Sequence, residues 1–139
     1  MKKLILTFVL SVFGVFCFAQ IEGKWKTIDD ETGKEKAIVE IFKKPDGKYY
    51  GKIIQLLITP TNNNCVKCTD DRKNKPLIGL EIIRGLQKDD DEFSGGTVVK
   101  PETGKTYKCI IKREGNKLKV RGYIGFSLIG VTQIWEKAD

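Results

Sequence analysis

The sequence lacks histidine altogether. Without an imidazole, the chain has no Ser/His/Asp or Cys/His nucleophilic site, no histidine general base and no histidine-ligated zinc, iron or haem. It also lacks a glycine-rich phosphate-binding loop that leads into a helix. These absences favour a binding protein over an enzyme, and they leave only an enzyme that works with carboxylates or thiols alone as a catalytic alternative. We therefore expect no catalytic residues, no metal site and no cofactor.

The first residues have the pattern of a secretory signal peptide. Lys2 and Lys3 precede a mostly apolar run over residues 4–18, and Ala19 completes a cleavage site of small residues. The run is shorter than the roughly 20 residues that a membrane-spanning helix needs, so a retained anchor is disfavoured. We predict a signal peptide at residues 1–19, no transmembrane segment in the mature chain, and a periplasmic or secreted location.

The mature chain, residues 20–139, is long enough for a single domain with a core of useful size. Removal of Lys2 and Lys3, the only charged residues of the leader, lowers the formal net charge from +7 to +5. No run of lysine or arginine is long enough to indicate a nucleic-acid partner, and we predict none. A charge of this size is ordinary for a solvated surface, although it would also suit contact with an anionic envelope component.

Short segments rich in β-branched and aromatic residues recur along the mature chain, and turn residues separate them. No long stretch holds a helical period. We therefore expect an all-β fold, a small antiparallel up-and-down β-barrel of about eight strands. The predicted strands are residues 24–28, 36–43, 48–56, 80–86, 92–100, 105–113, 117–124 and 131–137.

A long connection, residues 57–79, contains the motif Cys65-Val66-Lys67-Cys68. Outside the reducing cytosol, a disulfide between Cys65 and Cys68 is the favoured interpretation, with Cys109 as an alternative partner. A thioredoxin-like redox site is disfavoured, because Thr69-Asp70-Asp71 after Cys68 places two anions where a low thiol pKa would need positive charge. Zinc binding by the two thiolates would need two further ligands from those aspartates or Cys109.

Two acidic runs, Asp29-Asp30-Glu31 and Asp89-Asp90-Asp91-Glu92, lie where turns beside strands are predicted. Carboxylates at such positions are ordinary solvated turn residues. Neither run has the ligand spacing of a calcium-binding loop, and neither resembles the paired carboxylates of a hydrolase. We therefore interpret both runs as surface.

Residues 121–130 combine three glycines with Phe126, Leu128 and Ile129 in what should be a polar connection, which indicates an apolar lip at the end of the barrel. Arg121 beside it could stack on Trp25 or Trp135, or face inward to bind a carboxylate or phosphate. The candidate ligand-binding residues are Trp25, Tyr49, Arg121, Tyr123, Phe126 and Trp135.

A family resemblance covers essentially the whole mature chain. The chain starts with Gly23-Lys24-Trp25, the Gly-x-Trp start of lipocalin-like barrels, and it resembles the exported bacterial family called domain of unknown function 2147. The resemblance implies a small lipocalin-like barrel and no established activity. It rests on that start together with residues 46–53, Cys65-Val66-Lys67-Cys68, Gly95-Gly96, residues 103–109 and residues 118–126.

These observations lead to two functional hypotheses. The first is an exported, non-enzymatic, lipocalin-like barrel that binds a small apolar or amphipathic ligand, with an acid head group near Arg121, because an eight-stranded barrel can enclose one modest ligand. The alternative is an envelope interaction module with a packed barrel, which recognises a protein or a cell-wall polymer through its surface and the cysteine-containing loop.

Overall fold

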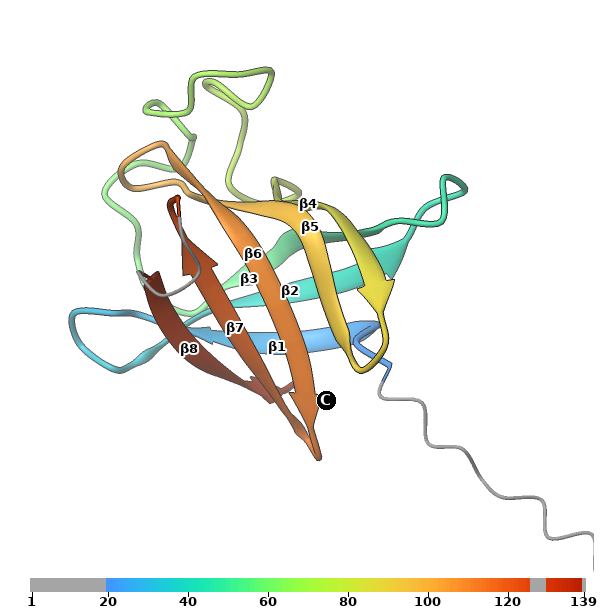
Figure 1. Ribbon diagram of the computed structural model, residues 1–139. Helices are drawn as coiled ribbons and strands as arrows, with labels where there is room; N and C mark the ends of the chain where they lie inside the picture. Colours follow the sequence, from blue (N-terminus) through green and yellow to red (C-terminus); the bar gives the residue numbers. More distant parts are fainter. Residues whose placement is uncertain (1–19, 126–129, 139) are drawn as a thin grey trace, which may run out of the picture.

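The protein is a closed barrel of eight antiparallel strands, in a computed structural model that describes residues 20–125 and 130–138 (Figure 1). Each strand pairs with the next along the chain, and β8 closes the barrel on β1. The expected all-β, up-and-down architecture is confirmed. The strands are β1 (Gly23–Ile28), β2 (Glu35–Lys43), β3 (Tyr49–Leu56), β4 (Glu81–Asp89), β5 (Glu92–Lys100), β6 (Lys105–Glu114), β7 (Lys117–Tyr123) and β8 (Gly130–Lys137).

The observed strands differ from the predicted ranges only at their ends. The largest difference is in β4, which continues to Asp89 instead of ending at Leu86. Within the described residues there is no helix with the length and apolar character needed to cross a membrane. The predicted signal peptide, residues 1–19, lies outside the described residues.

The connections divide the barrel into two ends. At one end, which we call the closed end, the chain enters β1, and short turns join β2 to β3, β4 to β5 and β6 to β7. At the other end, which we call the mouth, lie the connections after β1, β3, β5 and β7. The mouth faces the upper left of Figure 1, where the long β3–β4 connection, residues 57–80, rises above the barrel.

Trp25 closes the first end. Its side chain is fully buried, and its indole Nε1 donates a hydrogen bond to the Ile21 carbonyl at 2.8 Å. The Arg113 guanidinium lies over the Trp25 ring, 5.3 Å from the ring centroid, and donates to the carbonyls of Gly115 and Gln20. This arrangement ties the segment before β1 beneath the barrel and seals that end.

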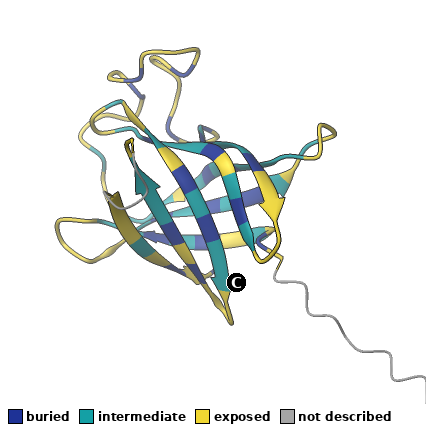
Figure 2. Ribbon diagram, in the orientation of Figure 1, coloured by how far each residue is buried: buried dark blue, intermediate teal, exposed yellow. Residues whose placement is uncertain are grey.

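Several inward-facing side chains near the mouth are smaller than those near the closed end. Alternation along each strand places every second residue inside, visible in Figure 2 as alternating dark blue and lighter positions. Toward the closed end the inward positions hold Ile41, Leu86, Phe93, Ile111 and Leu118, all nearly or fully buried. Toward the mouth they hold Thr27, Ala37, Val98 and Gly122. The closed half is therefore packed, and the mouth half has room.

Arg113→Ala removes the cation over the Trp25 ring together with two hydrogen bonds. We expect the free energy of unfolding to fall by about 1–2 kcal/mol, because a cation–π contact and hydrogen bonds of this kind contribute about that much. Urea denaturation measures the loss. Lys112→Ala on the same strand is the control, since Lys112 pairs with exposed Asp91 and should contribute less. Equal losses in the two variants would contradict a special role for Arg113.

The three cysteines of the described residues divide into a pair and a single thiol. Cys65 and Cys68 form a disulfide in the β3–β4 connection, as predicted. Cys109, on β6, is a free thiol inside the barrel with 1% of its surface exposed. Burial raises the pKa of Cys109 to about 12, because the interior disfavours the thiolate.

In protein comprising residues 20–139, we expect no thiol to react with a thiol reagent in the native state and one to react after unfolding without reductant. Three reactive thiols would contradict the disulfide.

As the pH rises above 9.0, the Cys109 thiol ionises in the unfolded chain but not in the folded one, so its contribution to stability is progressively lost. The difference in unfolding free energy between wild type and Cys109→Ala should therefore narrow with rising pH.

Candidate functional site

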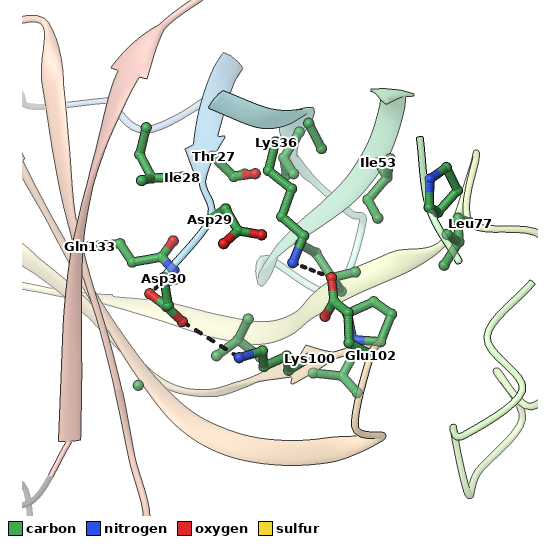
Figure 3. A pocket seen from close by; sticks show the side chains of 18 of the residues that line it. Thr27, Ile28, Asp29, Asp30, Lys36, Ile53, Leu77, Lys100, Glu102 and Gln133 are labelled. Carbon is green, nitrogen blue, oxygen red and sulfur yellow. Dashed lines mark hydrogen bonds and ion pairs between the residues drawn. The ribbon is translucent and has the colours of Figure 1, made fainter. Parts of the chain in front are cut away.

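A cavity of about 820 Å³ occupies the mouth half of the barrel, and residues from all eight strands line it (Figure 3). Its volume is within the range of sites that hold small molecules. The cavity exists because the inward positions near the mouth carry small side chains, whereas the closed half is filled. It is the strongest candidate for a functional site in the described part of the chain.

The wall of the cavity is mostly apolar. Val39, Ile53 and Val120 face inward near the middle of their strands and are nearly or fully buried. Burial of apolar surface contributes about 25 cal/mol per Å², so such a wall favours the apolar body of a ligand. Further apolar lining comes from Ala37, Leu77, Ile82, Val98, Val99 and Trp135.

Gly122 on β7 accounts for part of the open space. A Cβ at this position would lie 3.4 Å from the Tyr107 Cβ and 3.6 Å from a Val98 methyl group, which are ordinary contacts. The backbone conformation there is also accessible to other residues, because Gly122 does not have a positive φ. Glycine is therefore not required by the backbone, and its missing side chain leaves volume in the cavity.

A short chain of hydrogen bonds connects the cavity floor to the mouth. The Trp135 indole Nε1 donates to the Gln133 Oε1 at 2.8 Å, and the Gln133 Nε2 donates to the Asp30 carboxylate. Figure 3 shows Gln133 reaching from β8 toward Asp30 in the β1–β2 connection. The Nε1 of the buried tryptophan thus has a partner, and the half-buried Gln133 links it to Asp30.

Two ion pairs cross the mouth. In a closed barrel of eight sequential strands, the β1–β2 connection stands opposite the β5–β6 connection. The Lys100 ammonium, at the end of β5, lies 3.7 Å from the Asp30 carboxylate, and the Lys36 ammonium, at the start of β2, pairs with Glu102. All four residues line the cavity, and Figure 3 marks both pairs with dashed lines. Opposite walls are therefore joined electrostatically above the apolar space.

The β3–β4 connection forms another side of the mouth. Its Asn64, Val66 and Lys67 line the cavity. The disulfide between Cys65 and Cys68 constrains this stretch, and the Cys65 sulfur lies 3.8 Å from the Pro101 carbonyl in the β5–β6 turn. The loop that the sequence singled out is thus packed against the neighbouring turn as a wall of the cavity.

The two aspartates after Cys68 hold the loop in place and do not gather around a metal site. Arg72 is 4% exposed, and its guanidinium binds the Asp70 carboxylate and the Glu81 carbonyl. Asp71 pairs with Arg84 on β4. The Arg72 hydrogen bonds lower the pKa of Asp70 to about 2. No group of three or more potential ligands that could hold a metal ion occurs within residues 20–125 and 130–138.

The structure separates the six predicted ligand-binding residues. Trp135 and Tyr123 line the cavity. Trp25 forms the closed end, and Tyr49 packs edge-to-face on Phe93 with ring centroids 5.0 Å apart, away from the cavity lining. Phe126 lies outside the described residues.

Arg121 is not placed as either sequence-based hypothesis supposed. It alternates along β7 with Val120 and Gly122, which line the cavity, so its side chain lies on the outer face. There its Nη1 donates to the Thr132 hydroxyl at 3.0 Å. The guanidinium over Trp25 belongs to Arg113 instead. A head group inside the cavity would need another cation.

The sequence does not single out the polar residues of the mouth. Asp30 has the pattern of a solvated turn residue, and no motif marks Lys36, Lys100 or Glu102. Each lies at a strand end or in a short turn, where charged residues are ordinary. Their importance comes from the pairing of opposite connections across the barrel, and a linear sequence carries no local signal for that.

Comparisons with known proteins agree with this architecture. The model of the family described as an uncharacterized protein conserved in bacteria, domain of unknown function 2147, matches residues 23–137. A solved structure from the human pathogen Helicobacter pylori, described as belonging to the lipocalin family, is similar with a TM-score of 0.74 and 21% sequence identity, covering 86% of this chain and 84% of that chain. No curated protein matches the sequence. At this identity, the structural likeness establishes a lipocalin-like fold alone.

Gly104 should be essential for the contact between the β5–β6 turn and the β3–β4 connection. Its φ is 72°, and an added Cβ would overlap the Lys67 carbonyl oxygen. We expect Gly104→Ala to displace the loop and to accelerate tryptic cleavage at Lys67, measured by mass spectrometry. Gly115→Ala is the control, because Gly115 has a similar φ of 61° but open space around it, so only backbone strain of about 1–2 kcal/mol is added. Equal cleavage in both variants would contradict the packing argument.

Proposed function

The chain belongs to the bacterial family called domain of unknown function 2147, and from the barrel of this member we propose an exported, non-enzymatic binding protein for a small apolar or amphipathic ligand. The observation that carries the proposal is the cavity of about 820 Å³ in the mouth half of the barrel. A concave, largely apolar site with a few converging polar groups is the usual form of a small-molecule site.

The chemistry of the lining supports a ligand with an apolar body and a polar end. The middle of the barrel offers aliphatic side chains and the Trp135 ring, whereas charged groups occur only toward the mouth. An apolar chain that enters first would lose its contact with water, and a polar group that follows would stay near the lysines and carboxylates of the mouth.

Export rests on separate observations. Lys2, Lys3 and the apolar run up to Phe18 have the pattern of a secretory leader, although that segment lies outside the described residues. The disulfide between Cys65 and Cys68 is of a kind that persists in oxidising compartments. A periplasmic or secreted location would explain both features.

The alternative, an envelope interaction module, requires a barrel with a packed interior. The cavity favours the ligand-binding hypothesis over it. The non-enzymatic part of the proposal rests on the missing histidine and on the engagement of the mouth carboxylates in ion pairs and hydrogen bonds.

Titration with decanol, followed by tryptophan fluorescence, tests the proposal. We expect saturable quenching, because the Trp135 ring lines the cavity. Gly122→Leu should weaken binding at least about tenfold by filling the space, which corresponds to about 1.4 kcal/mol. Unfolding free energy should change little, since the new side chain enters a void.

The matched control for this variant is Lys119→Leu. Lys119 lies on the same strand but is exposed, and its side chain does not line the cavity. Its affinity should equal that of the wild type. If quenching is not saturable, or if Gly122→Leu and the wild type bind decanol equally well, the barrel does not hold the ligand as proposed.

A further inference from the structure

Three carboxylates and three ammonium groups line the mouth of the cavity. The carboxylates belong to Asp29, Asp30 and Glu102, and the ammonium groups to Lys36, Lys67 and Lys100. The formal charges of the two sets cancel, so net charge does not decide whether the site prefers an anionic or a cationic head group. The preference depends on which hydrogen-bond and ion-pair partners each carboxylate and each lysine already has.

Two of the three carboxylates are already committed to donors of the protein. One Asp29 oxygen accepts hydrogen bonds from the backbone N–H groups of Glu31 and Thr32, at 2.9 Å and 3.0 Å. These bonds hold the pKa of Asp29 below its ordinary value, so the carboxylate stays ionised and hydrogen-bonded to the backbone. Asp30 accepts a hydrogen bond from Gln133, which is itself held by the Trp135 indole.

The lysines are held less firmly. Lys36 and Lys100 each have one carboxylate partner within the described part of the chain, Glu102 and Asp30 respectively. Their side chains are 25% and 35% exposed, and both carry long, flexible stems. Lys67, the third ammonium group of the mouth, has no ion-pair partner among the described residues.

This asymmetry favours anions over cations as ligands. An incoming carboxylate can replace Glu102 at Lys36, or Asp30 at Lys100, and so exchange one ion pair for another of the same chemistry. An incoming ammonium group would have to displace Lys36 from Glu102 or Lys100 from Asp30, and would add a further ammonium group to a mouth in which Lys67 already lacks a carboxylate partner among the described residues. The mouth therefore accommodates an added negative charge more readily than an added positive charge.

We propose that Lys36 and Lys100 form the head-group site of the cavity, for an amphipathic ligand whose carboxylate displaces Glu102 and Asp30 while its apolar chain occupies the barrel. This inference rests on the proposed function, since it assigns the ligand class of the same cavity. It also replaces Arg121, which lies on the outer face, as the cation for the head group.

Three amphiphiles of equal chain length test the assignment: decanoate, decanol and decylamine. At about pH 8 the acid is anionic and the amine cationic, so only the charge of the head group differs. We expect decanoate to bind at least tenfold more tightly than decanol, and decylamine more weakly than either. Acetate should not compete at equal concentration, because it lacks the apolar chain. Tighter binding of decylamine than of decanoate would overturn the proposal.

Single variants locate the effect. Lys36→Gln and Lys100→Gln should each weaken decanoate binding about fivefold to tenfold and leave decanol binding unchanged. Lys26→Gln is the control, because Lys26 pairs with Glu35 near the same strand ends but does not line the cavity. It alters the net charge equally and should leave both affinities unchanged. If Lys26→Gln weakens decanoate as much as the mouth variants do, long-range charge and not a head-group site explains the preference.

Glu102→Gln provides the opposite test. Removal of the competing carboxylate leaves Lys36 available, so decanoate should bind severalfold more tightly, whereas decanol should be unaffected. Glu35→Gln is the control for the added positive charge. If Glu102→Gln strengthens decanol and decanoate equally, the ion pair only obstructs the mouth, and the head-group assignment is wrong. Decanol binding without a preference for decanoate overturns this inference alone, whereas no binding of any amphiphile overturns the proposed function as well.

Discussion

The structure depends on the change in side-chain size along the inside of a closed barrel. Closure gives every strand a hydrogen-bonded neighbour on both sides, so the sheet has no free edge strand. The number of strands sets the width of the interior, so the inward side chains alone decide whether it is filled. Trp25, Leu86 and Phe93 fill the closed half, whereas Ala37 and Gly122 leave the mouth half open. The closed half of each strand thus contributes to the packed core, whereas the mouth half lines the cavity.

The connections at the mouth have different structural roles. The β1–β2 and β5–β6 connections are joined across the mouth by the ion pairs of Lys100 with Asp30 and Lys36 with Glu102. The β3–β4 connection, constrained by its disulfide, packs against the β5–β6 turn and forms a wall. Exposed aliphatic side chains of the mouth lining complete its surface: Ile58, Val66, Ile124 and Val131. The two ion pairs therefore cross an otherwise apolar opening.

Local patterns predicted much of the fold because they act over short distances in the chain. Alternation along β6 and β7 places Cys109, Ile111 and Val120 on the inner face, and all three are buried there. The same alternation places Arg121 on the outer face, opposite Val120, where the structure has it. The glycine-rich segment beside Arg121 suggested a role for that arginine in stacking or ligand binding. The arginine that stacks on Trp25 is Arg113, which lies two residues after Ile111 on β6 and faces the closed end.

The sequence by itself determined the all-β class and the order and approximate extent of the strands, and it favoured the disulfide between Cys65 and Cys68, since these follow from periodicity, turn residues and near neighbours. Only the tertiary structure decided that the barrel contains a cavity and which charges meet at its mouth. The volume depends on inward residues from eight strands together, and Asp30 and Lys100 are seventy positions apart in the chain. Closure brings them within reach, and no local pattern encodes closure.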